Sequence, residues 1–60
     1  MHQNPKTLSI EEHLESAHKH MGRAGFLIIM MLVRHKASHY KMKEAIYELK
    51  MAITNLEIIL

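Results

Sequence analysis

The sequence predicts an all-α protein, a two-helix antiparallel hairpin that dimerises into a four-helix bundle. The 60-residue chain is 48% hydrophobic, and it holds six Met, two Gly, one Pro and no Trp. This usage is typical of helices and disfavours a small β-sandwich or barrel. Apolar residues also recur at steps of three and four, which is the period of a helix. A chain of this length has room for one domain.

The first helix is predicted to run from about residue 9 to 36, after a flexible leader over 1–8 that contains Pro5. Ser9 and Glu12 have the spacing of a capping box, in which each side chain bonds the backbone amide of the other residue. Beyond this start, a heptad-like line of mostly apolar residues predicts the buried side of the helix. Its members are Ile10, Leu14, Ala17, Met21, Ala24, Ile28, Met31 and His35.

Eight consecutive apolar residues, Phe26 to Val33, are the most unusual segment of the chain. A helix that is apolar all round is expected to be buried on every side. A domain this small hides only about 60% of its unfolded surface, so we expect a second copy to supply the missing cover. The apolar stretch from Ala24 to Val33 is too short for a membrane span, which needs about 20 residues.

Gly22 and Gly25 interrupt the helical pattern just before this run. With Ala24 they predict a patch of small residues where another helix backbone approaches closely. A turn at the two glycines is one alternative, and a buried strand over 26–33 is another.

The second helix is predicted over about residues 39–59, with Ser38 as its N-cap, so that residues 9–60 form one hairpin domain. A polar, basic stretch over 34–39 separates it from the first helix. One long or kinked helix of about 75 Å in a coiled-coil assembly is the alternative architecture. Twelve residues are predicted to form the core and the oligomer interface: Leu14, Ala17, Met21, Gly25, Ile28, Met31, Leu32, Met42, Ile46, Leu49, Ile53 and Leu56.

Six histidines raise the question of a metal site. His35 and His39 are four residues apart, a spacing that chelates a metal only if one helix carries both. Glu15 and His18 form a Glu-x-x-His pattern like that of di-iron four-helix bundles, and in a hairpin turning near residue 37 Glu57 would lie level with His18. Glu15 lies to one side of the predicted core face, however, so we expect neither a metal nor any other cofactor.

The charge pattern is compatible with a second kind of binding site, one for an anion. The formal net charge is +2, and the cations gather around the predicted turn. Such a cluster is usually a solvated helix end, although it also fits an anion or a nucleic acid. The candidate contacts are Arg23, Arg34, Lys36, Lys41 and Lys43.

No catalytic or phosphate-binding motif is present, so the sequence favours a small non-enzymatic interaction or regulatory protein that homo-oligomerises and binds another macromolecule. A nucleic-acid-binding helical dimer and a metal-binding bundle are the alternatives. The absence of cysteine favours a reducing compartment, and together with the lack of a signal peptide or transmembrane segment it predicts a cytoplasmic location. The sequence does not identify a protein partner.

Overall fold

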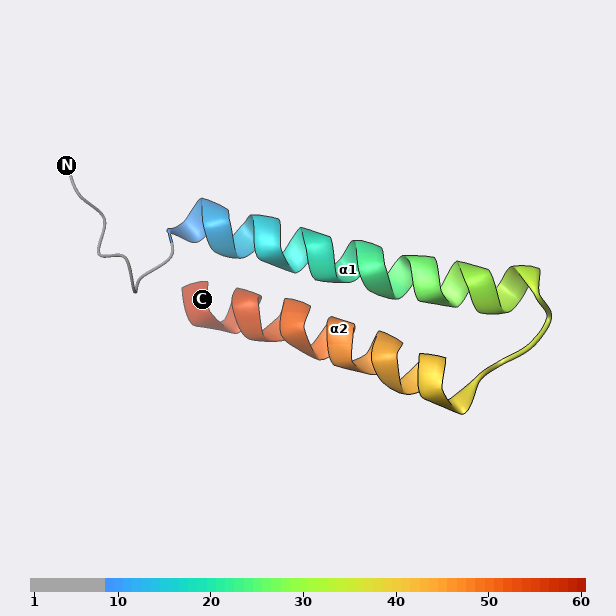
Figure 1. Ribbon diagram of the computed structural model, residues 1–60. Coiled ribbons are helices and arrows are strands. Elements are labelled where there is room, and N and C mark those ends of the chain that lie inside the picture. The colour runs from blue at the N-terminus through green and yellow to red at the C-terminus, as the bar shows by residue number, and fades with distance from the viewer. Residues whose placement is uncertain (1–8) are drawn as a thin grey trace.

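The structure, a computed structural model, describes residues 9–60, so the predicted leader over 1–8 lies outside the described residues. Helix α1 spans Ile10–Val33 and helix α2 spans His39–Ile59. The two helices lie side by side and antiparallel, joined by a short connection (Figure 1). The all-α hairpin is thereby confirmed, and the alternative of one long helix is wrong.

Helix α1 begins at the predicted capping box. The Glu12 amide donates to Ser9 Oγ at 3.1 Å, and the Ser9 amide donates to Glu12 Oε1 at 3.1 Å. Two amides at the start of the helix, which have no partner within it, are satisfied in this way. Glu11 and Glu12 also place negative charge near the positive end of the helix dipole.

Helix α1 ends at Val33, three residues before the predicted end, because the chain turns left-handed at His35. The amide of Lys36 donates to the carbonyl of Met31, and the amide of His35 donates to that of Leu32. These two bonds form a Schellman motif, with His35 at φ 52° in the position that usually holds glycine. The sequence concealed this stop because no glycine marks it.

Helix α2 begins at His39 with Ser38 as its N-cap, as predicted. Ser38 Oγ accepts a hydrogen bond from the Lys41 amide at 3.3 Å, and the Ser38 carbonyl accepts one from the Met42 amide at 2.8 Å. No acidic residue lies in the first turn of this helix. The positive end of its dipole therefore lies among cations.

Alanines form the contact between the two helices. Ala17 and Ala24 in α1 and Ala45 and Ala52 in α2 are the buried hydrophobic residues, and in each helix they are one heptad apart. Small side chains at this spacing let two helices approach closely. The predicted buried line of α1 is therefore corrected, because Ile10, Leu14, Met21 and Ile28 from that line are exposed while its alanines are buried.

The glycines do not make the close contact that the sequence suggested. A Cβ atom built on Gly22 or Gly25 would meet no atom within 4 Å. Ala24, with 1% of its surface exposed, is the residue of that patch that lies against α2. Within the hairpin, the predicted close-packed patch thus reduces to Ala24.

The apolar run over 26–33 is mostly exposed in the single hairpin. The burial on every side that the sequence predicts is therefore not supplied by the hairpin alone. Leu27, Met30 and Met31 are half-buried, whereas the other five residues of the run are exposed. One antiparallel neighbour covers only one side of a helix, so α2 cannot enclose a segment that is apolar all round.

Candidate functional site

A continuous apolar surface follows from this arrangement. Residues one position after the contact line on each helix point about 100° away from it. Because the helices are antiparallel, the residues that follow the contact line on α1 and those that follow it on α2 lie on the same side of the hairpin. Near the connection, Ile28 and Leu32 of α1 line one depression of about 340 Å³ together with Met42 of α2.

We call this surface the apolar face. Its nine large residues are between 41% and 67% exposed, and none of them is charged. They are Leu14, Met21, Ile28, Leu32, Met42, Ile46, Leu49, Ile53 and Leu56. All nine belong to the twelve residues predicted for the core and the oligomer interface, and so does the exposed Gly25. Ala17 is buried in the helix contact and Met31 is half-buried beside it.

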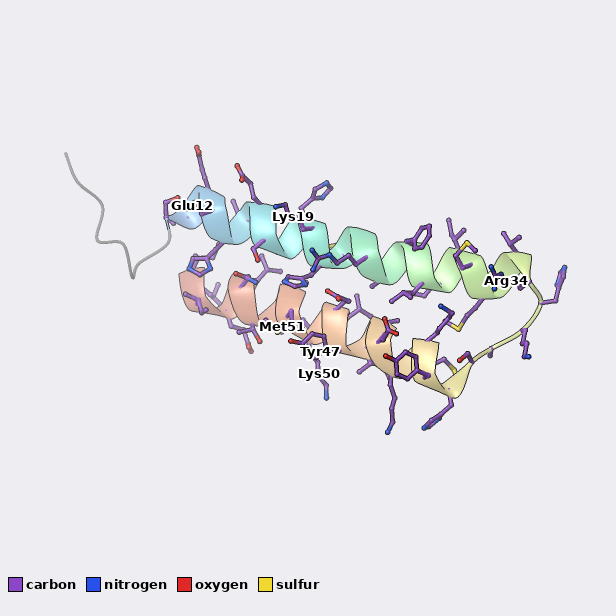
Figure 2. The ribbon with its side chains drawn as sticks, in the orientation of Figure 1. Glu12, Lys19, Arg34, Tyr47, Lys50 and Met51 are labelled. Carbon is purple, nitrogen blue, oxygen red and sulfur yellow. The ribbon has the colours of Figure 1, made fainter. Side chains whose placement is uncertain are left out.

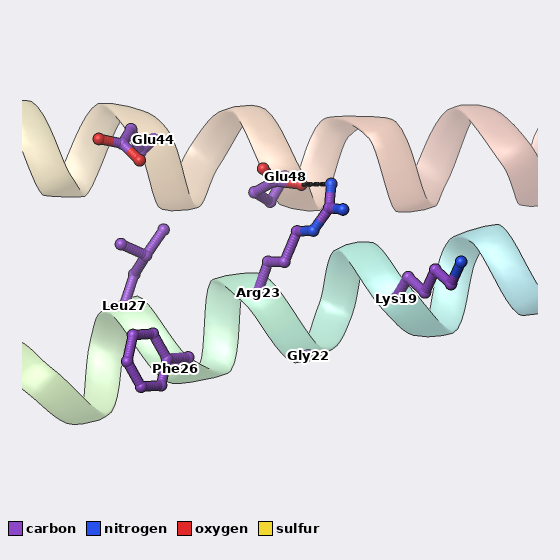
Figure 3. A pocket seen from close by; sticks show the side chains of 7 residues that line it. All are labelled: Lys19, Gly22, Arg23, Phe26, Leu27, Glu44 and Glu48. Carbon is purple, nitrogen blue, oxygen red and sulfur yellow. Dashed lines mark ion pairs between the residues drawn. The ribbon is translucent and has the colours of Figure 1, made fainter.

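The opposite side of the hairpin is shallow, and charged and apolar residues are mixed on it. Lys19, Arg23 and Phe26 of α1 and Glu44 and Glu48 of α2 line an open depression of about 410 Å³ there, together with Gly22 and Leu27 (Figure 3). Arg23 extends from α1 toward Glu48, with 3.9 Å between Nη1 and Oε1. Charges of both signs make this side unlike the apolar face.

Two polar pairs lie within the alanine contact. His13 Nδ1 is 2.8 Å from Asn55 Oδ1, and His20 Nδ1 is 2.5 Å from Glu48 Oε1. The Asn55 amide nitrogen donates to the Met51 carbonyl at 2.9 Å. Since Asn55 Oδ1 can only accept, the hydrogen in the first pair belongs to His13 Nδ1.

These pairs were missed at the level of sequence, although a signal existed. His13 and His20 are one heptad apart and in phase with the buried alanines of α1, and Glu48 and Asn55 are one heptad apart in α2. Polar residues in phase with small residues therefore marked the contact line, while the larger residues marked the apolar face.

The proposed anion contacts separate into two groups. Arg34, Lys36 and Lys41 line a depression of about 210 Å³ at the connection, with Met30, Met31 and Ser38. Arg23 lies in the middle of the hairpin beside Glu48. Lys43 lies on α2 outside this depression and is exposed.

The metal candidates do not assemble in the hairpin. His35 lies in the connection and His39 begins α2, so no single helix carries both. The pairs His13–Asn55 and His20–Glu48 place position 18 beside position 50.

Glu57 therefore lies beyond the level of His18, which corrects the predicted register. The connection folds back along the end of α1, so α2 begins beside α1 rather than beyond its last residue (Figure 1). Within residues 9–60, no three side chains of His, Asp or Glu lie close enough together to hold a metal ion.

Comparison with protein families, curated proteins and solved structures finds no match to this chain. Neither helix of the described residues has the length and apolar character needed to cross a membrane.

Proposed function

We propose that this protein is a non-enzymatic helical interaction module whose apolar face binds a second copy of the chain. Two hairpins paired through this face form a four-helix bundle, which then binds another macromolecule. The observation that carries the proposal is the contrast between a contact whose buried hydrophobic residues are all alanine and nine large apolar side chains left exposed on one side.

The energetics favour pairing over an isolated hairpin. Burying a Leu, Ile or Met side chain contributes about 1.5–3 kcal/mol, whereas alanine contributes little because it has a single methyl group. Isolated helices are marginal in water, and most helix stability in proteins comes from packing an apolar face. Covering the apolar face with a second copy would therefore stabilise the hairpin more than its own alanine contact does.

Analytical ultracentrifugation tests the proposal with a pair of matched variants. Ile53 lies on the apolar face and Ile58 lies on the opposite side of the same helix, and both side chains are more than half exposed. We expect Ile53→Glu to give a monomer at concentrations where the wild type and Ile58→Glu are dimers. A monomeric wild type, or equal dissociation of both variants, would contradict the proposal.

A second measurement covers the case in which Ile53→Glu fails to fold. The melting temperature of a dimer rises with protein concentration, since dilution favours the unfolded monomer. We expect this rise for the wild type and for Ile58→Glu, followed by circular dichroism. A wild-type melting temperature independent of concentration would oppose self-association.

The three cations around the connection favour a polyanion such as RNA or DNA as the macromolecule bound by the assembly. Such binding should weaken steeply with salt, in proportion to the phosphates that are neutralised. Fluorescence anisotropy with labelled RNA and duplex DNA measures it. We expect Lys36→Gln and Lys41→Gln to reduce both the affinity and the salt slope, and no binding at low salt would end this candidate.

A further inference from the structure

We infer that the second copy lies antiparallel to the first on the apolar face, with the connection of each hairpin beside the open end of the other. This inference rests on the proposed self-association and adds the orientation of the pair. The observation that carries it is the separation of charge along the hairpin.

The end of the hairpin at the connection carries an excess of cations. Arg34, Lys36, Lys41 and Lys43 gather there, and the sequence has no Asp or Glu from residue 16 to 43. Figure 2 shows Arg34 at this end of the molecule. The negative end of the α1 dipole and the positive end of the α2 dipole both lie at the connection and offset each other, so the side-chain charges set the sign of this end.

The open end carries the opposite sign. Glu11, Glu12 and Glu15 lie in the first two turns of α1, and Glu57 lies in the last turn of α2. All four are exposed. Lys50, which points away from α1 in Figure 2, is the nearest cation of the described residues in α2.

The two charged ends are far enough apart for their charges to determine the orientation of the pair. Helix α1 has 24 residues and is therefore about 36 Å long, whereas charges are screened over about 8 Å at physiological ionic strength. Each end of one hairpin thus responds only to the end of the partner that lies across from it. A parallel pair stacks cations on cations and carboxylates on carboxylates, while an antiparallel pair places opposite charges together at both ends.

The orientation also decides which helices of the two copies pack on each other. In the antiparallel pair, α1 packs on the partner's α1 and α2 packs on the partner's α2, so Met21 lies near the two-fold axis. In the parallel pair, α1 packs on the partner's α2 instead. All neighbouring helices are antiparallel in both arrangements, so the helix dipoles do not decide between them.

Spin labels measure the orientation directly. The chain has no cysteine, and Ala37 is exposed in the connection, so Ala37→Cys accepts a single label. We expect a label-to-label distance of about 36 Å or more, the length of α1. A distance below about 20 Å, two helix diameters, would overturn the orientation but leave the dimer intact. A monomeric mass would instead refute the proposed function.

Charge exchange supplies an independent test that does not depend on a label. The first variant carries Arg34→Glu and Lys36→Glu, the second carries Glu15→Lys and Glu57→Lys, and the third carries all four changes. In an antiparallel dimer the first two should each associate about tenfold more weakly at low salt, because surface ion pairs are lost at both ends. The third should also associate more weakly than the wild type, because two of the four charges named at each end are then positive and two are negative.

A parallel dimer predicts a different series. The first and second variants would then each neutralise one end and relieve its repulsion, so both should associate more tightly than the wild type, and the third more tightly still. Salt gives the same discrimination without any substitution, since added NaCl should weaken an antiparallel dimer and strengthen a parallel one. Variants that match the wild type or associate more tightly than it, or an affinity that rises with salt, would overturn the inference.

Discussion

His13 Nδ1 donates a hydrogen bond to Asn55 Oδ1 at 2.8 Å, and this bond joins the first turn of α1 to the last turns of α2. Both residues are buried, at 8% and 7% exposed, in a contact whose buried hydrophobic residues are all alanine. Sliding one helix along the other would leave both groups buried without partners, and an unsatisfied buried polar group costs about 1–3 kcal/mol. The pair therefore selects the register of the hairpin.

Asn55→Ala should lower the free energy of unfolding by about 1–3 kcal/mol, because His13 Nδ1 loses its acceptor in a buried contact, while the Met51 carbonyl keeps its bond within the helix. Urea denaturation followed by circular dichroism measures this loss. All variants are compared at one protein concentration, since the stability of a dimer depends on concentration.

The double variant His13→Leu, Asn55→Leu is the control for this pair. Replacing both partners by apolar groups of similar size is often nearly neutral. We therefore expect the double variant to be more stable than Asn55→Ala. If it is less stable than the single variant, the pair does more than satisfy two buried groups.

Ala24→Leu should destabilise the hairpin by about 1–3 kcal/mol, because a larger side chain at a closely packed contact forces the backbones apart. Ala24 is the most buried residue of the contact, with 1% of its surface exposed. Thermal unfolding at fixed concentration measures the effect. Ala37→Leu, in the exposed connection, serves as the control and should change the melting temperature little.

Gly22→Ala should raise the free energy of unfolding by about 1 kcal/mol, the difference in helix propensity between the two residues. The position is exposed within α1, and the added Cβ would meet no neighbour within 4 Å. Urea denaturation again provides the measurement. A loss of stability would show that Gly22 lies against another chain in the assembly.

Local signals allowed much of the fold to be predicted from sequence. Ser9 with Glu12 and Ser38 with Lys41 are separated by three residues, so their bonds follow from local geometry once a helix begins. The alternation of two apolar segments with a polar stretch between them was sufficient to indicate a hairpin.

The contact between the helices was harder to predict because it is made of weakly apolar residues. Leu14 and Met21 are larger and more hydrophobic than Ala17 and Ala24, so a pattern of apolarity assigns the larger side chains to the buried side of α1. The structure places alanines there and leaves the larger residues on the apolar face. A pattern based on large apolar side chains therefore identified the apolar face and not the contact between the two helices.

His35→Gly should stabilise the hairpin by about 0.5–1 kcal/mol. His35 has φ 52°, a left-handed conformation that strains a residue with a Cβ but not glycine. The gain is smaller than the full strain because glycine also gives the unfolded chain more freedom. Urea denaturation of His35→Gly, His35→Asn and His35→Ala should rank stability in that order, since asparagine tolerates this conformation better than alanine. Equal stabilities for Gly and Ala would mean that the connection adopts another backbone in solution, and the Schellman bonds of Lys36 and His35 would not then be what ends α1.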